Sequence, residues 1–132
     1  MKSQEIGKRA EQLARYYLEQ KGLIFKYQNF HSRYGEIDLI MQQGNDLCFI
    51  EVRARKYQNY GTALDTVSIH KQQKIIQTAQ SFLQLYPENE RLFGRFDVIG
   101  LQYSSPEIWL IEDLSLQLAK IDLEWIQDAY TL

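Results

Sequence analysis

The chain has 132 residues, of which 45% are hydrophobic, and its 15 basic and 17 acidic residues give a net charge of −2. This length and composition predict one domain over residues 1–132 and exclude a protein that coats nucleic acid through net positive charge. A single cysteine, Cys48, excludes an intramolecular disulfide, and the lack of long apolar runs favours a cytoplasmic protein that does not contact membranes.

The first predicted element is an amphipathic helix over residues 3–21, where apolar side chains recur at spacings of three and four. Ser3 is the expected N-cap and Gly22 the expected C′ residue. Glu11 falls at the margin of the apolar stripe. It can pair with Arg15 on the helix surface or reach towards the sheet, and the spacing leaves both readings open.

Three strands are expected next. Residues 23–29 are rich in β-formers, and residues 36–42 and 47–55 alternate in polarity. Turn residues separate the last two runs, so a hairpin with a two-residue turn at 44–45 is predicted.

This turn fixes which residues of the hairpin face one another. Paired positions sum to 89, so Asp38 lies opposite Glu51 and Glu36 lies opposite Arg53. Like charges placed directly opposite destabilise a sheet unless a cation lies between them. Two adjacent carboxylates suit Mg²⁺ or Mn²⁺ and therefore phosphodiester chemistry. The alternative is a solvated face in which Glu36 pairs with Arg53 and Asp38 with Arg55.

Basic charge is concentrated before residue 81. Residues 1–80 hold twelve Lys and Arg against eight Asp and Glu, whereas residues 81–132 hold three against nine. A surface that contacts phosphate should therefore come from the first part of the chain, and aromatic residues among cations suit contact with nucleic acid. The candidate nucleic-acid-binding residues are Arg33, Arg55, Lys56, Tyr60, Lys71 and Lys74.

The second half begins with a predicted helix over residues 68–86 that is capped by Ser68. Two strands are expected at 95–101 and 107–112, and a short docking helix is expected within 113–132. The whole pattern predicts an α/β fold in which helices flank a mixed sheet of about five strands, in αβββαββ order.

Several motifs occur in order: GEIDLI at 35–40, FIEVRAR at 49–55, YG at 60–61, Lys71, and RFDV at 95–98, within a resemblance that runs from about Gly7 to about Tyr130. Together they resemble the YraN-like family of the restriction-endonuclease-like PD-(D/E)xK nuclease superfamily. The resemblance implies a nuclease core similar in plan to the archaeal Holliday junction resolvases. It also implies DNA as the partner, branched or single-stranded, and leaves a homodimer open.

Carried over to this chain, the family pattern places the site acids at Glu11, Asp38 and Glu51. Asp38, Glu51 and the Val52 carbonyl would be the metal ligands, and Glu36 is assigned as a supporting acid. The resemblance thus implies a magnesium- or manganese-dependent DNA endonuclease.

Arg53 departs from the family pattern, which has lysine at this position. A guanidinium stays charged, so Arg53 cannot act as a general base, although it can stabilise charge on the phosphorus. Lys56 and Lys71 are candidates for a displaced lysine. The sequence therefore leaves three hypotheses: a nuclease that cleaves branched or structured DNA, a nucleic-acid-binding module of the same fold with impaired catalysis, and a small protein-interaction domain.

Overall fold

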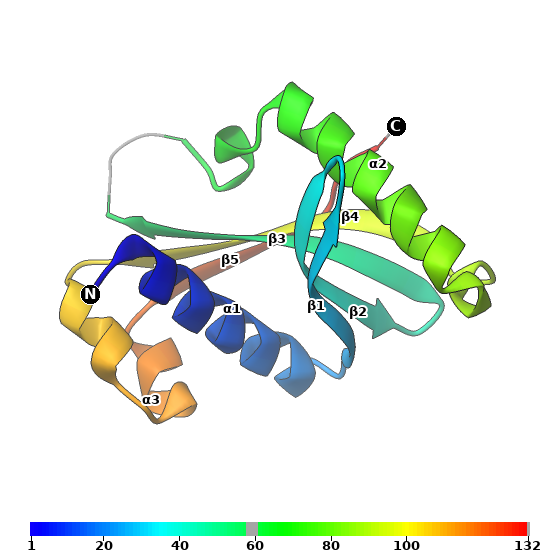
Figure 1. Ribbon diagram of the computed structural model, residues 1–132. Coiled ribbons are helices and arrows are strands. Elements are labelled where there is room, and N and C mark those ends of the chain that lie inside the picture. The colour runs from blue at the N-terminus through cyan, green and yellow to red at the C-terminus, as the bar shows by residue number, and fades with distance from the viewer. Residues whose placement is uncertain (58–60, 132) are drawn as a thin grey trace.

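A five-stranded mixed sheet with helices on both faces forms the fold (Figure 1). The computed structural model describes residues 1–57 and 61–131. The helices and strands, in chain order, are α1 (Ser3–Gln20), β1 (Ile24–Ser32), β2 (Gly35–Gln43), β3 (Asp46–Lys56), α2 (Ile69–Leu85), β4 (Phe93–Tyr103), α3 (Leu114–Ala119) and β5 (Asp122–Tyr130).

The strands lie side by side in chain order, β1-β2-β3-β4-β5. Neighbouring strands are antiparallel except for β3 and β4, which are parallel. A parallel pair needs a crossover connection, and the segment that contains α2 supplies it. The mixed α/β sheet flanked by helices, expected for a restriction-endonuclease-like core, is confirmed.

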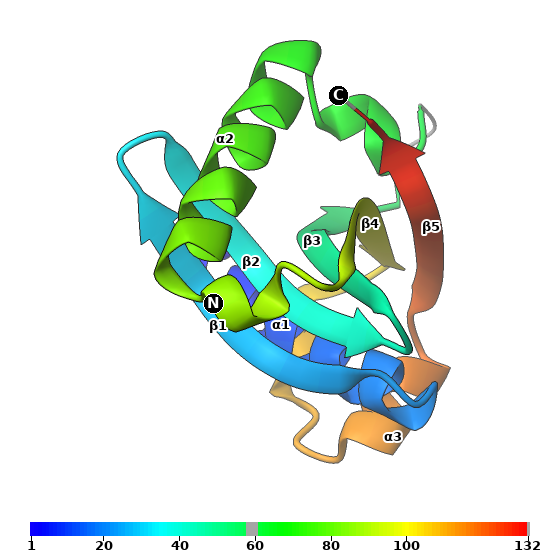
Figure 2. The same ribbon diagram turned by 90° about the vertical axis from the view of Figure 1, so that its right-hand side faces the viewer.

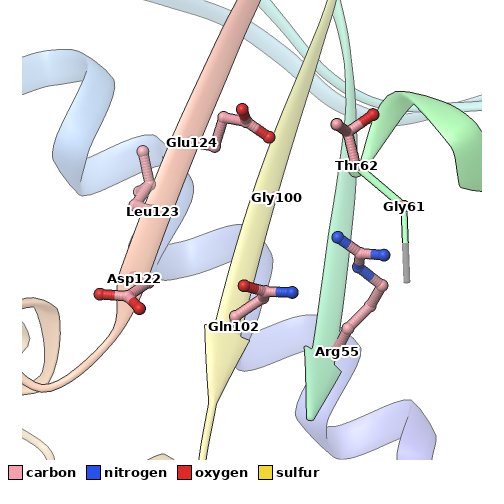
Figure 3. A pocket seen from close by; sticks show the side chains of 8 residues that line it. All are labelled: Arg55, Gly61, Thr62, Gly100, Gln102, Asp122, Leu123 and Glu124. Atoms are coloured by element: carbon pink, nitrogen blue, oxygen red, sulfur yellow. The ribbon is translucent and has the colours of Figure 1, made fainter. Parts of the chain in front are cut away.

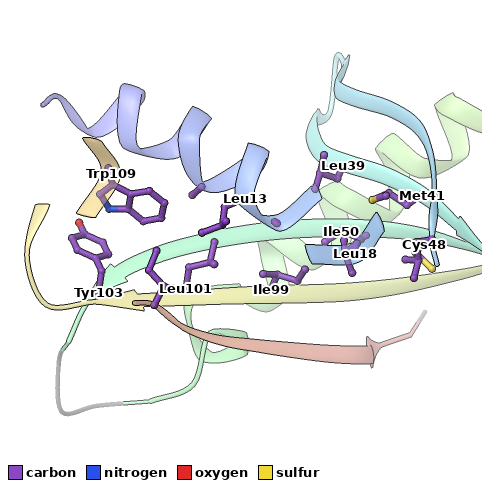
Figure 4. Packing of buried hydrophobic residues seen from close by; sticks show 14 of the residues in the cluster. Leu13, Leu18, Leu39, Met41, Cys48, Ile50, Ile99, Leu101, Tyr103 and Trp109 are labelled. Atoms are coloured by element: carbon purple, nitrogen blue, oxygen red, sulfur yellow. The ribbon is translucent and has the colours of Figure 1, made fainter. Parts of the chain in front are cut away.

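The helices divide between the two faces of the sheet. α1 and α3 lie on one face and α2 lies on the other, as two perpendicular views agree (Figures 1 and 2). Figure 4 shows the packing beneath α1, where Leu13 and Leu18 meet Leu39, Ile50 and Ile99. The core beneath α2 is rich in aromatic rings, among them Phe30, Phe49, Phe82 and Phe96. No helix in the described part of the chain is long and apolar enough to cross a membrane.

The two ends of α1 are capped differently: the N-terminus lacks a side-chain cap, and the C-terminus ends at a glycine. The N-cap is Lys2, without a side-chain cap, so the assignment of Ser3 is wrong by one residue. Gly22 occupies C′ at φ +91°, as predicted, and the amide of Leu23 donates to the carbonyl of Leu18 at 3.0 Å. This Schellman end turns the chain sharply into β1 and holds α1 against the sheet.

The predicted hairpin register is confirmed over the whole paired length. Gln43 pairs with Asp46 and Leu39 with Ile50, so paired positions sum to 89. Gly44 has φ +58°, a conformation that glycine adopts without a steric penalty. Continuing the register by one residue places Asp38 across from Glu51.

The strand boundaries change at the start of the hairpin. β1 continues through residues 30–32, which were expected to form a polar link, and the chain turns only at Arg33 and Tyr34. The hydroxyls of Ser32 and Thr78 lie 3.0 Å apart, so the tip of the β1–β2 hairpin contacts α2.

Two predictions near the C-terminus are wrong. Residues 107–112 are not a strand, because a 3-10 helix spans Pro106–Leu110. The short helix within 113–132 is α3, but the residues whose spacing predicted it, Trp125, Ile126, Ala129 and Tyr130, lie in strand β5. In this strand Ile126 pairs with Val98 and Tyr130 pairs with Phe96. A bulge at Asp128, whose φ is +50°, inserts extra residues between those partners. The bulge therefore gives a strand the four-residue apolar spacing of a helix.

Candidate functional site

The central feature of the site is Asp38, which lies where the β2–β3 ladder ends. Pairing stops at Leu39 and Ile50, and the carboxylate of Asp38 then accepts a hydrogen bond of 2.8 Å from the backbone amide of Val52. The side chain thus takes the place of a strand carbonyl as the acceptor for β3. Asp38 is 9% exposed and Glu51 only 4%, so both acids are buried.

The two acids interact directly. Burial, then the charge of Glu51 and a hydrogen bond to Glu51, together raise the pKa of Asp38 to about 9, although the hydrogen bond from the Val52 amide acts in the opposite direction. Two carboxylates this close cannot both ionise easily without a cation. Near neutral pH, and in the absence of metal, Asp38 therefore keeps its proton.

Glu11 joins this pair from α1. Burial raises the pKa of Glu11, while hydrogen bonds to Asn29 and Asp38 lower it. Glu11 therefore reaches the acids of the hairpin, as the family pattern implies, instead of remaining on the helix surface. We call Glu11, Asp38 and Glu51 the acidic cluster.

The pKa of Asp38 predicts how stability depends on pH. The group binds its proton up to about pH 9 in the folded, metal-free protein but releases it near 3.8 when unfolded. Its contribution to stability is complete below the lower value and is lost as the pH rises towards the upper one. We expect the free energy of unfolding, measured with urea and EDTA, to fall between pH 5 and 9. Asp38→Asn should flatten this dependence, and an unchanged slope in that variant would assign the titration to another group.

Lys71 provides the positive charge nearest to these acids. Its Nζ lies 2.7 Å from Oε2 of Glu51. The Ser68 side chain caps α2 by accepting from the backbone amide of Lys71, which fixes this first turn of the helix. The lysine at the site therefore comes from α2 and not from β3.

Arg53 lies on the same face of β3 as Glu51 but binds elsewhere. Its Nη2 donates to the carbonyl of Thr66 at 3.1 Å. The alternative prediction was a pair of cross-strand salt bridges, Glu36 with Arg53 and Asp38 with Arg55. Neither salt bridge forms between these described side chains.

Glu36 stands apart from the buried pair. Its Oε2 lies 3.1 Å from Nδ1 of His31, and 43% of its side chain is exposed. Together with Lys8, Glu11 and Asn29, these two residues line an open groove of about 540 Å³. The groove connects the acidic cluster to solvent along the N-terminal end of α1.

The predicted nucleic-acid-binding residues fall into two groups. Lys71 and Lys74 lie on the first turns of α2. The β1–β2 hairpin, which carries Arg33, approaches Lys74 closely: a Cβ added to Gly35 would lie 3.9 Å from Cβ of Lys74. Arg55 and Lys56 lie at the far end of β3. Tyr60 lies outside the described residues.

Three buried donors on the α2 face of β3 and β5 lack a hydrogen-bond partner among the described residues, which the sequence did not indicate. Arg53 Nε, Arg55 Nε and the hydroxyl of Tyr130 have no hydrogen-bond partner within the described part of the chain. Burial raises the pKa of Tyr130, and the charges of Glu51 and Asp97 act in the same direction. Unpaired donors on this face suit an anionic ligand or the water that accompanies it.

Asn29 is a second residue missed in the sequence. It has φ +52° within β1 and lines the groove beside Glu11. Asparagine tolerates this left-handed conformation better than most residues, and an asparagine inside a predicted strand was the available signal.

The acids fit a hard divalent cation in number and type. Mg²⁺ commonly takes one or two carboxylates and completes its octahedron with water and substrate phosphate oxygens. In residues 1–57 and 61–131, no three His, Cys, Asp or Glu side chains already converge on one point as a metal site. Asp38 and Glu51 alone supply the pair, and the proton held on Asp38 marks the position where positive charge is needed.

Comparison with known proteins identifies close relatives. The model of the Uncharacterised protein family UPF0102 matches residues 10–101. A UPF0102 protein of Acinetobacter baumannii strain AYE is 41% identical over 132 residues, which cover 98% of this chain and 97% of the relative. A UPF0102 protein of Legionella pneumophila strain Corby is 46% identical over 109 residues, or 82% of this chain and 92% of the relative.

Proposed function

The chain belongs to the UPF0102 family, the YraN-like group of restriction-endonuclease-like proteins, and from that premise we propose that it is a metal-dependent DNA endonuclease. Its substrate would be branched or otherwise structured DNA, as for the Holliday junction resolvases that the fold resembles in plan. The observation that carries the proposal is the buried Asp38–Glu51 carboxyl pair, with a lysine ammonium in contact with it.

In this reaction, water attacks the phosphorus, one phosphorus–oxygen ester bond breaks, and the leaving oxygen takes up a proton. Mg²⁺ or Mn²⁺, when bound, would supply the Lewis acid that polarises the phosphate and acidifies the attacking water. Asp38, Glu51 and the Val52 carbonyl would hold this ion. Glu11 would hold a water or a second ion, and Glu36 would support the cluster from the groove.

Lys71 takes the role that the family pattern assigns to a lysine on β3. Its Nζ already contacts Glu51, so a modest movement brings the ammonium to a phosphate oxygen or to the attacking water. Arg53 would supply a second, fixed positive charge from β3, because its Nε has no partner within the described residues. The two cations would divide the work of orientation and charge stabilisation.

Replacing Lys71 with methionine tests whether the Lys71 ammonium contributes to catalysis. We expect the cleavage rate to fall about 10²-fold, because the variant removes the charge while keeping the aliphatic length of the side chain. Lys74→Met is the matched control from the same face of α2, and it should chiefly raise KM. Equal losses in kcat for the two variants would mean that Lys71 contributes only general attraction for DNA.

The activity is tested by incubating four-way junction, flap and linear duplex DNA with Mg²⁺ or Mn²⁺, each against EDTA. The proposal expects metal-dependent products and faster cleavage of the branched substrates.

The alternative is a binding module of the same fold, which Arg53 favours because arginine replaces the lysine of the family pattern. It predicts binding to branched or single-stranded DNA that is indifferent to Mg²⁺ and gives no product. Failure to bind any nucleic acid at low salt would instead favour a protein-interaction domain.

A further inference from the structure

A polar pocket of about 310 Å³ lies beyond Arg53 on the α2 side of the sheet (Figure 3). Its volume is at the lower end of the range for sites that bind small ligands or single groups. The pocket is separate from the acidic cluster and from the groove beside Glu11. Its lining residues are Arg55, Gly61, Thr62, Gly100, Gln102, Asp122, Leu123 and Glu124.

Register across three strands builds the base of the pocket. Arg55 of β3 pairs with Gln102 of β4, and Gln102 pairs with Asp122 of β5. Two residues before Gln102 on β4, and on the same face of the sheet, Gly100 pairs with Glu124. Arg55 of β3 and Asp122 of β5 therefore lie on either side of Gln102, and Glu124 lies beside Gly100, as Figure 3 shows.

The opposite wall depends on Gly100. A Cβ at this position would lie 2.5 Å from Cβ of Ala63, closer than any real contact. Because Gly100 has no side chain, Ala63 packs directly on the sheet and is fully buried. The adjacent Thr62 is thereby held at the rim of the pocket, opposite Glu124.

The charges of the lining residues restrict what the pocket can hold. Asp122 and Glu124 would repel a phosphate, so the pocket is not a contact for the phosphates of the DNA backbone. Arg55, whose buried Nε has no described partner, would likewise repel a cation. A neutral group can pair with both kinds of lining residue if it has acceptors on one edge, for Arg55, and donors on another, for the carboxylates. A nucleobase is such a group.

We propose that this pocket binds an unpaired guanine next to the cleavage site. Guanine carries two adjacent N–H donors on its Watson–Crick edge, which a carboxylate such as Glu124 accepts together. Its O6 and N7 are acceptors for an arginine, here Arg55. The other bases do not combine two adjacent donors with that acceptor pair.

Two further features suit a base. Tyr57 is 52% exposed and its hydroxyl bonds to the carboxylate of Asp122, so an aromatic face lies beside the pocket, where a base can stack. Arg55 is four residues from Glu51 along β3, or roughly 13 Å at the rise of an extended strand. The neighbouring nucleotides of a single strand can span this distance.

This inference rests on the proposed function for its biological setting, but its test does not need cleavage. The ¹⁵N-labelled full chain is titrated with dGMP, dAMP, dCMP and dTMP in EDTA, and amide shifts are followed by NMR. We expect dGMP to shift the amides of Gly100, Gln102 and Leu123, with a Kd about tenfold lower than those of the other nucleotides.

Glu124→Gln provides the matched variant, since Glu124 is exposed and the change keeps its size. It should weaken dGMP binding about tenfold and leave dAMP binding unchanged, whereas Glu107→Gln, outside the pocket, should change neither. Equal affinity for the four nucleotides, or absence of shifts at these amides, would overturn the proposal. Binding of dGMP by a chain that cleaves no DNA would support the pocket and refute the nuclease. Cleavage of DNA by a chain that does not prefer dGMP would support the nuclease and refute the guanine pocket.

Discussion

Replacing Glu51 with glutamine should reduce metal-dependent cleavage of branched DNA on the order of 10³-fold or more. Glu51 is 4% exposed, is proposed as a metal ligand and contacts the ammonium of Lys71, so its charge serves both partners at once. Glutamine keeps the shape of the side chain but cannot balance a divalent cation. Initial rates under Mg²⁺ and Mn²⁺, compared with those of the wild type, measure the effect.

The control for this variant is Glu107→Gln, which makes the same charge change at an exposed position in a 3-10 helix. It should keep full activity. A second measurement separates a role in the site from a folding defect: the charge of Glu51 raises the pKa of Asp38, so Glu51→Gln should lower that pKa in the metal-free protein. Wild-type cleavage by the Glu51 variant would rule out this site.

Replacing Asp97 with alanine should destabilise the fold by about 3–5 kcal/mol, because it removes the buried partner of Arg95 and leaves the donors of Trp125 and Asp128 without an acceptor. Asp97 is fully buried and accepts from Nε of Arg95 at 3.0 Å and from Nε1 of Trp125 at 3.0 Å. It also accepts from the backbone amide of Asp128 at 2.9 Å, which holds the bulge of β5. Urea denaturation at neutral pH measures the loss.

Asp46→Asn provides the comparison for this second variant. Asp46 pairs with the same Arg95 at 2.8 Å, but 41% of its side chain is exposed. Solvent weakens such a pair, so the cost should stay below about 1 kcal/mol. If Asp97→Ala cost no more than Asp46→Asn, the network around Arg95 would not hold β4 and β5 together. The double variant R95M/D97L should recover part of the loss, since no unpaired buried charge remains.

The hairpin was predictable from sequence because its determinants are local. A two-residue turn at Gly44 fixes the register, and alternation then decides which side chains share a face. The juxtaposition of Asp38 and Glu51 follows from these two rules alone. Glu11 required the family pattern, because helical spacing is equally compatible with a surface acid.

The C-terminal region was not predictable because a bulge changes the period of β5. Ile126 and Tyr130 are four residues apart, yet they pair with Val98 and Phe96, which are two residues apart. A spacing of four residues indicates a helix, so the region was predicted as helical. The position of the Tyr130 hydroxyl therefore could not be predicted either. The contact between Lys71 and Glu51 joins two elements across the crossover, so no local pattern specifies it.

The central claim is that Asp38 and Glu51 share a divalent cation, and the most direct test is a crystal soaked in Mn²⁺ and measured at the manganese absorption edge. We predict an anomalous peak between the two carboxyl groups, within coordinating distance of both. Absence of that peak at saturating Mn²⁺, with the Lys71–Glu51 ion pair unchanged, would contradict the claim.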